Sequence, residues 1–160
     1  QGVIIRVNSP GGSVLAADQI LNAVNEFKKV SNKPVYTSMG TFAASGGYYV
    51  ALGSDRIFAN GASITGSIGV MSGFLNFHDF DKKFGIQSES LSTGKYMDTY
   101  SEHQKFTNDK KAMVAQHQQK SYRRFLSLVQ ESRQLTDNEV SSVAQGQFMT
   151  GKEAKAMGAD

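Results

Sequence analysis

The sequence predicts an α/β fold with a mostly parallel sheet and a helical C-terminal part. Apolar strand-like segments alternate with amphipathic helical segments in the first part of the chain, which is typical of parallel β-α units. Turns of small residues join strand to helix at residues 8–12 and around Ser45. The length of 160 residues and the hydrophobic content of 39% suffice for one domain with a buried core.

The first β-α unit pairs a strand over residues 3–7 with the helix that follows the turn at residues 8–12. Lys33-Pro34 ends this unit, and a second strand is expected from residue 35 to residue 38. A helix then follows Ser45. The first helix has apolar residues at helical spacing, which predict one buried face: Val14, Ala17, Ile20, Leu21, Val24 and Phe27.

Glycines and helix-capping residues divide the rest of the chain. Gly85 can end a short helix, and two Thr-x-x-Glu patterns can each start one. The remaining expected elements are a short strand at 56–59, an ordered glycine-rich loop at 60–76, a short helix at 76–84, a strand at 87–91, a long polar helix at 107–133 and two helices that begin at the capping boxes Thr136–Glu139 and Thr150–Glu153.

Composition excludes several classes of protein. The net charge of +3 comes from 17 basic and 14 acidic residues without a basic run, so nucleic-acid binding is not expected. The chain has no cysteine, which rules out disulfides and thiolate zinc sites and is compatible with an oxidising compartment. No apolar stretch reaches the length of a membrane span. We expect residues 1–160 to form a single domain that is truncated at both ends.

Ser45 is the candidate nucleophile. It lies at a small-residue corner between an apolar strand and a helix, where a hydroxyl can stand clear of the backbone. The free N–H groups at the start of that helix could stabilise an oxyanion. A helix cap is the structural alternative. The Pro-Gly-Gly turn adds a second strand-turn-helix, and in a parallel sheet Gly11 or Gly12 should converge with Ser45.

The general base is harder to find. His117 lies on the long polar helix, His103 is expected to be exposed, and His78 among phenylalanines is expected to be structural, so a Ser-His-Asp triad is disfavoured. His78 and its aspartate neighbours do not make a metal site, and we expect neither a metal nor a cofactor. Lys95, between a glycine and aromatic residues, is the lysine candidate, although it must be desolvated to act near neutral pH.

Four ordered motifs stand out along nearly the whole chain, at residues 7–14, 43–49, 64–70 and 144–154. Together they resemble the signal peptide peptidase A family of bacterial serine proteases. The resemblance implies a Clp protease/crotonase-like fold of stacked β-α units. It also implies that Ser45 is the nucleophile, that Gly11 or Gly12 and Gly46 form the oxyanion hole, and that Ser67 helps hold a general-base lysine.

The lysine is where the chain departs from the family pattern. In the family the lysine falls third after a glycine, and counting from Gly94 gives Met97, whose thioether cannot serve as a base. Lys95 could reach the site through a shifted loop, the base could come from another domain or subunit, or the domain could be catalytically silent. The second account is favoured, because the chain resembles the serine-bearing half of a two-half protein.

The resemblance further implies a membrane-associated peptidase with a Ser/Lys dyad. It would cleave signal peptides or other hydrophobic peptides on the extracytoplasmic side of the bacterial cell membrane, anchored by segments outside this chain. Homo-oligomers with a shared active site are expected. The alternatives are a silent scaffold or assembly domain and a crotonase-type acyl enzyme. Apolar residues expected around the site are Phe42, Tyr48, Tyr49, Ile68, Val70 and Met71.

Overall fold

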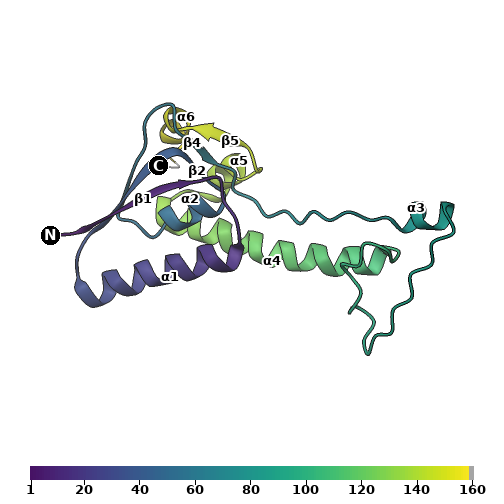
Figure 1. The fold of residues 1–160 in the computed structure, drawn as a ribbon. Coiled ribbons are helices and arrows are strands. Elements are labelled where there is room, and N and C mark those ends of the chain that lie inside the picture. Colours follow the sequence, from purple (N-terminus) through teal and green to yellow (C-terminus); the bar gives the residue numbers. More distant parts are fainter. Residues whose placement is uncertain (159–160) are drawn as a thin grey trace. The chain divides into compact units, whose positions relative to one another are not determined.

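The computed structural model describes residues 1–158 and confirms the α/β class (Figure 1). Its sheet has five strands in the order β1-β2-β4-β5, and β3 also pairs with β2. All pairings are parallel except that of β4 with β5. The strands are β1 (Val3–Ser9), β2 (Val35–Ala44), β3 (Arg56–Phe58), β4 (Ile64–Gly66) and β5 (Phe148–Thr150), and the helices are α1 (Val14–Ser31), α2 (Gly46–Ala51), α3 (His78–Lys83), α4 (Asn108–Arg133), α5 (Asp137–Val143) and α6 (Gly151–Ala156).

The chain divides into two compact units. The first comprises residues 1–70 together with the described residues from 121 onward, and it contains every strand of the sheet. The second comprises residues 71–120 and contains α3 and the first part of α4. A compact unit is not necessarily a domain that folds alone, so the single domain over residues 1–160 stays a prediction.

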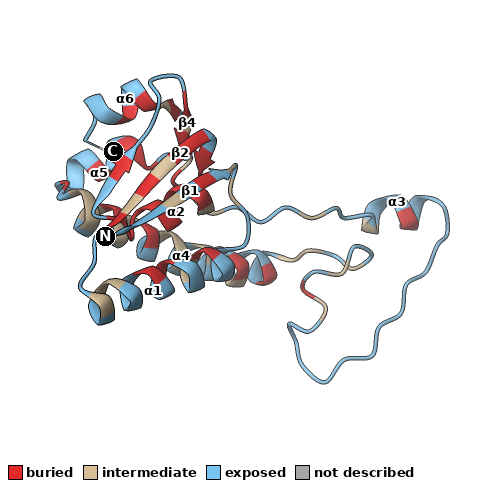
Figure 2. Ribbon diagram, turned by 60° about the vertical axis from the view of Figure 1, so that its left-hand side comes forward, coloured by how far each residue is buried: buried red, intermediate tan, exposed pale blue. Residues whose placement is uncertain are grey.

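The core of the first unit lies where β2 meets α1, α2 and the second half of α4. Alternate residues of β2 are buried at Val35, Thr37 and Met39, as expected for a strand with one face on the core. Figure 2 shows buried residues in red on α2 and, alternating with less buried ones, along β2. The rings of Tyr49 and Phe125 lie 4.9 Å apart between centroids, which packs α2 against α4.

The predicted buried face of the first helix is only partly correct. Ala17, Leu21 and Val24 are buried. Ile20 and Phe27 remain exposed, as does Val14 at the start of the helix. The face of α1 that is buried is narrower than the apolar face that the sequence predicts. Some apolar side chains of α1 therefore remain exposed to solvent.

Two strands were not expected and one expected strand is absent. β4 falls inside the predicted glycine-rich loop, and β5 pairs with it antiparallel near the end of the chain. Each is three residues long, too short for a periodic pattern to reveal. Residues 87–91 form no strand, because the sheet lies in the first unit and no strand partner accompanies them.

The helical predictions for the C-terminal part are confirmed. α4 covers nearly the predicted range, with Phe125 and Val129 buried. Both capping boxes form, since Thr136 and Thr150 each accept a hydrogen bond from the backbone N–H of the glutamate three residues on. These caps fix where α5 and α6 begin.

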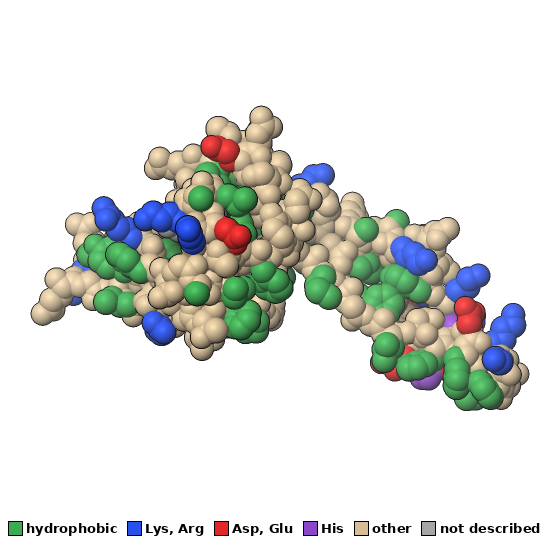
Figure 3. All heavy atoms as spheres, turned by 90° about the horizontal axis from the view of Figure 1, so that it is seen from above, with side chains coloured by type: hydrophobic (Ala, Val, Ile, Leu, Met, Phe, Trp, Pro, Cys, Tyr) green, Lys and Arg blue, Asp and Glu red, His purple; other side chains and the backbone are tan. Residues whose placement is uncertain are grey.

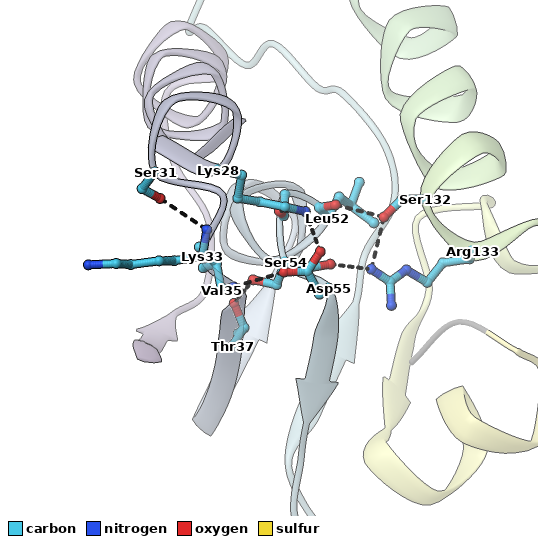
Figure 4. A network of polar contacts seen from close by, with 11 residues as sticks. Lys28, Ser31, Lys33, Val35, Thr37, Leu52, Ser54, Asp55, Ser132 and Arg133 are labelled. Carbon is cyan, nitrogen blue, oxygen red and sulfur yellow. Dashed lines mark hydrogen bonds and ion pairs between the residues drawn. The ribbon is translucent and has the colours of Figure 1, made fainter. Parts of the chain in front are cut away.

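A polar cluster ties helices α1 and α4 to the amino ends of β2 and β3 (Figure 4). Asp55 accepts a hydrogen bond from the Val35 N–H at 2.8 Å and pairs with the Lys28 ammonium at 2.7 Å. Ser132 donates to the carbonyl of Leu52 at 2.6 Å. Hydrogen bonding from Lys28, and then from Val35, holds the pKa of Asp55 below its usual value. The cluster fastens the end of the sheet opposite Ser45.

Asp55→Asn should lower the free energy of unfolding by roughly 1 kcal/mol at pH 7, because the ion pair is lost at a carboxylate that solvent partly screens. A lowered folded-state pKa stabilises the fold above the ordinary carboxyl pKa of about 3.9, and this stabilisation is lost as the pH falls through the folded value. Denaturation of both proteins from pH 7 to pH 3 should therefore show a shrinking difference. Glu26→Gln, at an exposed residue of α1, is the control and should have little effect.

Candidate active site

Three strand ends meet at one edge of the sheet and bring the predicted site residues of the first unit together. β1 leads into the turn that holds Gly11 and Gly12, β2 into Ser45, and β4 into Ser67. The Ser45 N–H donates to the carbonyl of Gly66 at 2.8 Å, and this hydrogen bond joins the end of β2 to the end of β4. The parallel sheet thus produces the expected convergence.

Ser45 has an unusual backbone conformation. Its φ of 51° and ψ of −118° lie in a region that favours glycine. Its carbonyl accepts the N–H of Tyr49 at 2.9 Å, in the first turn of α2. The side chain does not cap α2, so the helix-cap alternative for this serine is wrong. The sharp strand-to-helix turn instead holds the hydroxyl out of the backbone, as a serine nucleophile requires.

Gly11 lies directly against Ser45. A Cβ atom at Gly11 would come within 2.8 Å of the Ser45 Cβ and 3.1 Å of its Oγ, and the φ of Gly11 is +125°. A Cβ at Gly47 would meet the carbonyl oxygen of Ser9 at 2.8 Å. Only glycine allows the backbones of the two turns to approach this closely.

The hydrogen bonds distinguish the two glycines of the Pro-Gly-Gly turn. The Gly11 N–H donates to Ser9 Oγ at 3.2 Å. The N–H groups of Gly12 and Gly46 have no acceptor within residues 1–158. The Gly12 nitrogen lies 3.3 Å from the position of a Cβ at Gly46, so these two donors are neighbours. Gly12 and Gly46 therefore suit an oxyanion better than Gly11 does.

A cavity of about 450 Å³ adjoins these donors, between β1 and α1. Apolar side chains contribute to its lining, among them Val7, Ile20 and Val50. The six apolar residues expected around the site do not line this cavity. Tyr48, Tyr49 and Ile68 are instead buried in the core. The sequence pattern did not reveal the lining, since it lies on three elements, β1, α1 and α2, that pack together only in the fold.

Ser67 also has a positive φ, of 50°. Its N–H donates to the carbonyl of Gln147 at 2.7 Å, in the segment that leads into β5. The loop after β4 is thereby fixed at the strand ends that carry Ser45. The role of Ser67 beside a lysine stays a prediction.

Lys95 lies in the second unit, beside Asp109. Its ammonium is 2.6 Å from the Asp109 carboxylate and 5.2 Å from the centroid of the Tyr96 ring. The side chain is 67% exposed. Its hydrogen bond with Asp109 raises the pKa of Lys95, whereas a general base needs a lowered pKa. In this arrangement Lys95 is held in its charged form.

Two histidines form a polar cluster in the second unit. His103 Nδ1 lies 2.6 Å from the buried carboxylate of Asp81, and His78 lies 3.4 Å from the carbonyl of His103. His117 is exposed on α4.

Throughout residues 1–158, no group of three or more acidic or histidine side chains is arranged to hold a metal. None of the helices described here has the length and apolar character to span a membrane.

Comparison with known proteins decides the family. A profile described as Peptidase family S49 matches residues 27–159. The chain is 39% identical to Protease 4 of Haemophilus influenzae, with 96% of the chain and 25% of that protein covered. It is 34% identical to the putative signal peptide peptidase SppA of Enterococcus faecium, with 96% and 44% covered. It is 33% identical to the chloroplastic serine protease SPPA of Arabidopsis thaliana, with 99% and 23% covered.

The chain belongs to peptidase family S49. This confirms the resemblance to signal peptide peptidase A proteins and the serine peptidase class of the family. The S49 chain spans between a quarter and a half of the length of its bacterial relatives named above.

The sequence interpretation of this S49 chain missed residues that support the site. The Ser9 hydroxyl fixes the Pro-Gly-Gly turn with two hydrogen bonds. It donates to the Gly11 carbonyl and accepts from the Gly11 N–H, at 3.2 Å each. Asn8 accepts the N–H of Phe42 at 3.2 Å, beside the irregularity in the pairing of β1 with β2. Both residues stand directly before Pro10, so the only available signal was their turn-forming residue type.

The backbone of Ser45 yields a prediction for this S49 chain. Ser45→Gly should be more stable than Ser45→Ala by about 1 kcal/mol, because glycine adopts a positive φ without strain. Both variants lack the hydroxyl, so the difference isolates the backbone term. Thermal and chemical denaturation of the two variants checks it. Equal stabilities would mean that the turn relaxes to an ordinary conformation.

Proposed function

We propose that this chain is the serine-bearing part of a bacterial serine endopeptidase that cleaves signal peptides or other hydrophobic peptides in or near the membrane. One observation carries the proposal: the Ser45 hydroxyl projects from a strained turn beside the unpaired N–H groups of Gly12 and Gly46. The names of the relatives, Protease 4 and signal peptide peptidase SppA, support it.

In this proposal Ser45 Oγ attacks the carbonyl carbon of the scissile peptide bond and transfers its proton to a neutral lysine. The Gly12 and Gly46 N–H groups donate to the oxygen on which negative charge develops. Collapse of the tetrahedral intermediate expels the amine, which takes up the proton, and leaves an acyl group on Ser45. Water then releases the acyl group by the reverse sequence of proton transfers.

The base comes from a lysine outside this chain, in another domain or subunit. Lys95 is paired with Asp109 and its pKa is raised, and Met97 stands at the position where the family pattern has a lysine. Ser67 would hold the amine of the incoming lysine. An active site of this kind is complete only when the domain or subunit that carries the lysine lies against this one.

Exposed apolar side chains of the second unit support assembly. They stand out in green beside basic residues in Figure 3. Patches of this kind mark association surfaces more often than free surface. The residues are Met71, Leu75, Phe77, Phe80, Phe84, Ile86, Leu91, Tyr96, Met97 and Tyr100.

The substrate would lie as an extended peptide along β1. This strand is at the edge of the sheet, so its outer backbone groups can pair with an added strand. The cavity beside Gly12 would take an apolar side chain next to the scissile bond. A silent scaffold is the second candidate, favoured only by the methionine at position 97.

The full-length protein should react with a fluorophosphonate probe, and Ser45→Ala should abolish both labelling and peptide cleavage. Ser13→Ala is the matched control, because it removes a hydroxyl that caps α1 close to the same turn and should retain labelling. A folded, assembled full-length protein that is neither labelled nor active would establish the silent scaffold instead.

Lys95→Ala in the full-length protein should retain most of the labelling rate and peptidase activity, because the amine belongs to an ion pair with Asp109. Lys82→Ala, another lysine of the second unit, serves as the control. Initial rates over a range of pH are the measurement. A loss of more than about a hundredfold in Lys95→Ala alone, a typical effect of removing a general base, would identify Lys95 as that base.

A further inference from the structure

Three side chains from three helices of the first unit form a closed set of hydrogen bonds. Tyr49 of α2 donates its hydroxyl proton to Asp18 of α1 at 2.6 Å. Arg124 of α4 donates to the same carboxylate oxygen through Nη2 at 2.6 Å and Nε at 2.8 Å. Arg124 Nε also lies 3.1 Å from the Tyr49 hydroxyl. Each member therefore contacts both others.

The charges of this set are fixed at neutral pH. Burial, followed by the hydrogen bond to Asp18, raises the pKa of Tyr49 to about 12, so the phenol stays a neutral donor. The hydrogen bond from Tyr49, assisted by those from Arg124, holds the pKa of Asp18 below its usual value. The Tyr49 side chain is buried, while the Arg124 side chain is 53% exposed and closes the set from outside.

The set joins α2, which begins with the proposed donor Gly46, to α1, which follows the turn that holds the proposed donor Gly12. Asp18 lies in the second turn of α1, the helix that follows the Gly12 turn, and Tyr49 lies in α2, whose first residue is Gly46. Asp18 is also the neighbour of Ala17, whose Cβ is 3.6 Å from the position of a Cβ at Gly46. The bond between Asp18 and Tyr49 thus links α1, which follows Gly12, with α2, which begins at Gly46.

α2 depends on such outside support. It has six residues and no side-chain cap at its start, and helices this short are not stable by themselves. At its far end, Ser132 donates to the carbonyl of Leu52 at 2.6 Å. In its second half, the Tyr49 hydroxyl is bonded to Asp18 and Arg124. Oxyanion donors act only when they are held at about 2.7–3.1 Å from the developing charge.

We infer that Asp18 and Tyr49, braced by Arg124, are positioning residues that set the separation of the Gly12 and Gly46 N–H groups. The inference rests on the proposed function, because it assigns these N–H groups to the oxyanion of the peptidase reaction. The three residues do not touch the substrate. They act on the transition state, through the spacing of the donors, more than on ground-state binding of the peptide.

The test uses full-length Tyr49→Phe and Asp18→Asn variants with a peptide substrate and a peptide aldehyde that forms a tetrahedral adduct with serine. We expect kcat to fall about tenfold to a hundredfold, with KM within about twofold of the wild-type value. Aldehyde affinity should weaken in parallel with kcat. The double variant should be little worse than the more severe single one, since both changes weaken the same set of hydrogen bonds.

Asp55→Asn is the matched control, because it alters a carboxylate with a lowered pKa at the other end of the sheet. It should reduce thermal stability and leave kcat and aldehyde affinity unchanged. If Tyr49→Phe and Asp18→Asn behave in the same way, the set is merely structural and the inference is overturned. A wild-type protein that reacts with neither probe nor substrate would instead overturn the proposed function, and this inference with it.

Discussion

The first unit depends on the contact between two backbone turns that leaves no room for a side chain. A Cβ atom at Gly11 would collide with Ser45, and one at Gly47 would collide with the carbonyl of Ser9. Because the turns touch, the end of β1 and the start of α2 cannot move independently. This contact fixes the position of α2 relative to the end of β1. It therefore also fixes the direction in which the Ser45 hydroxyl projects.

The two ends of the sheet differ in how their polar groups are paired. At the amino ends of β2 and β3, buried Thr37 and Ser54 hydroxyls lie 2.6 Å apart, and the pair of Lys28 with Asp55 is close by. At the carboxyl ends, backbone strain and unpaired N–H groups are concentrated around Ser45. At the first end the side chains of Lys28, Asp55, Thr37 and Ser54 are paired, which contributes stability. At the second end the N–H groups of Gly12 and Gly46 remain available for the proposed chemistry.

Much of the fold could be predicted because its determinants are local. The helical pattern, the Thr-x-x-Glu caps and the small-residue turns each act within a few residues, and the capping-box helices begin where these signals stand. β4 and β5 could not be predicted, since each is three residues long and depends on a partner distant in sequence. The proposed nucleophile and oxyanion glycines follow from residue type. The Asp18–Tyr49–Arg124 set does not, because nothing in the spacing of 18, 49 and 124 indicates that they meet.

The conformation of Ser45 has a consequence for the history of such chains. A residue that costs stability where it stands is retained only while something selects for it. If selection for the chemistry were lost, replacement of Ser45 by glycine would raise the stability of the fold. This substitution would be expected before other changes in the surrounding turn. A serine at φ 51° therefore fits the proposed role of its hydroxyl, because the backbone conformation alone would favour glycine.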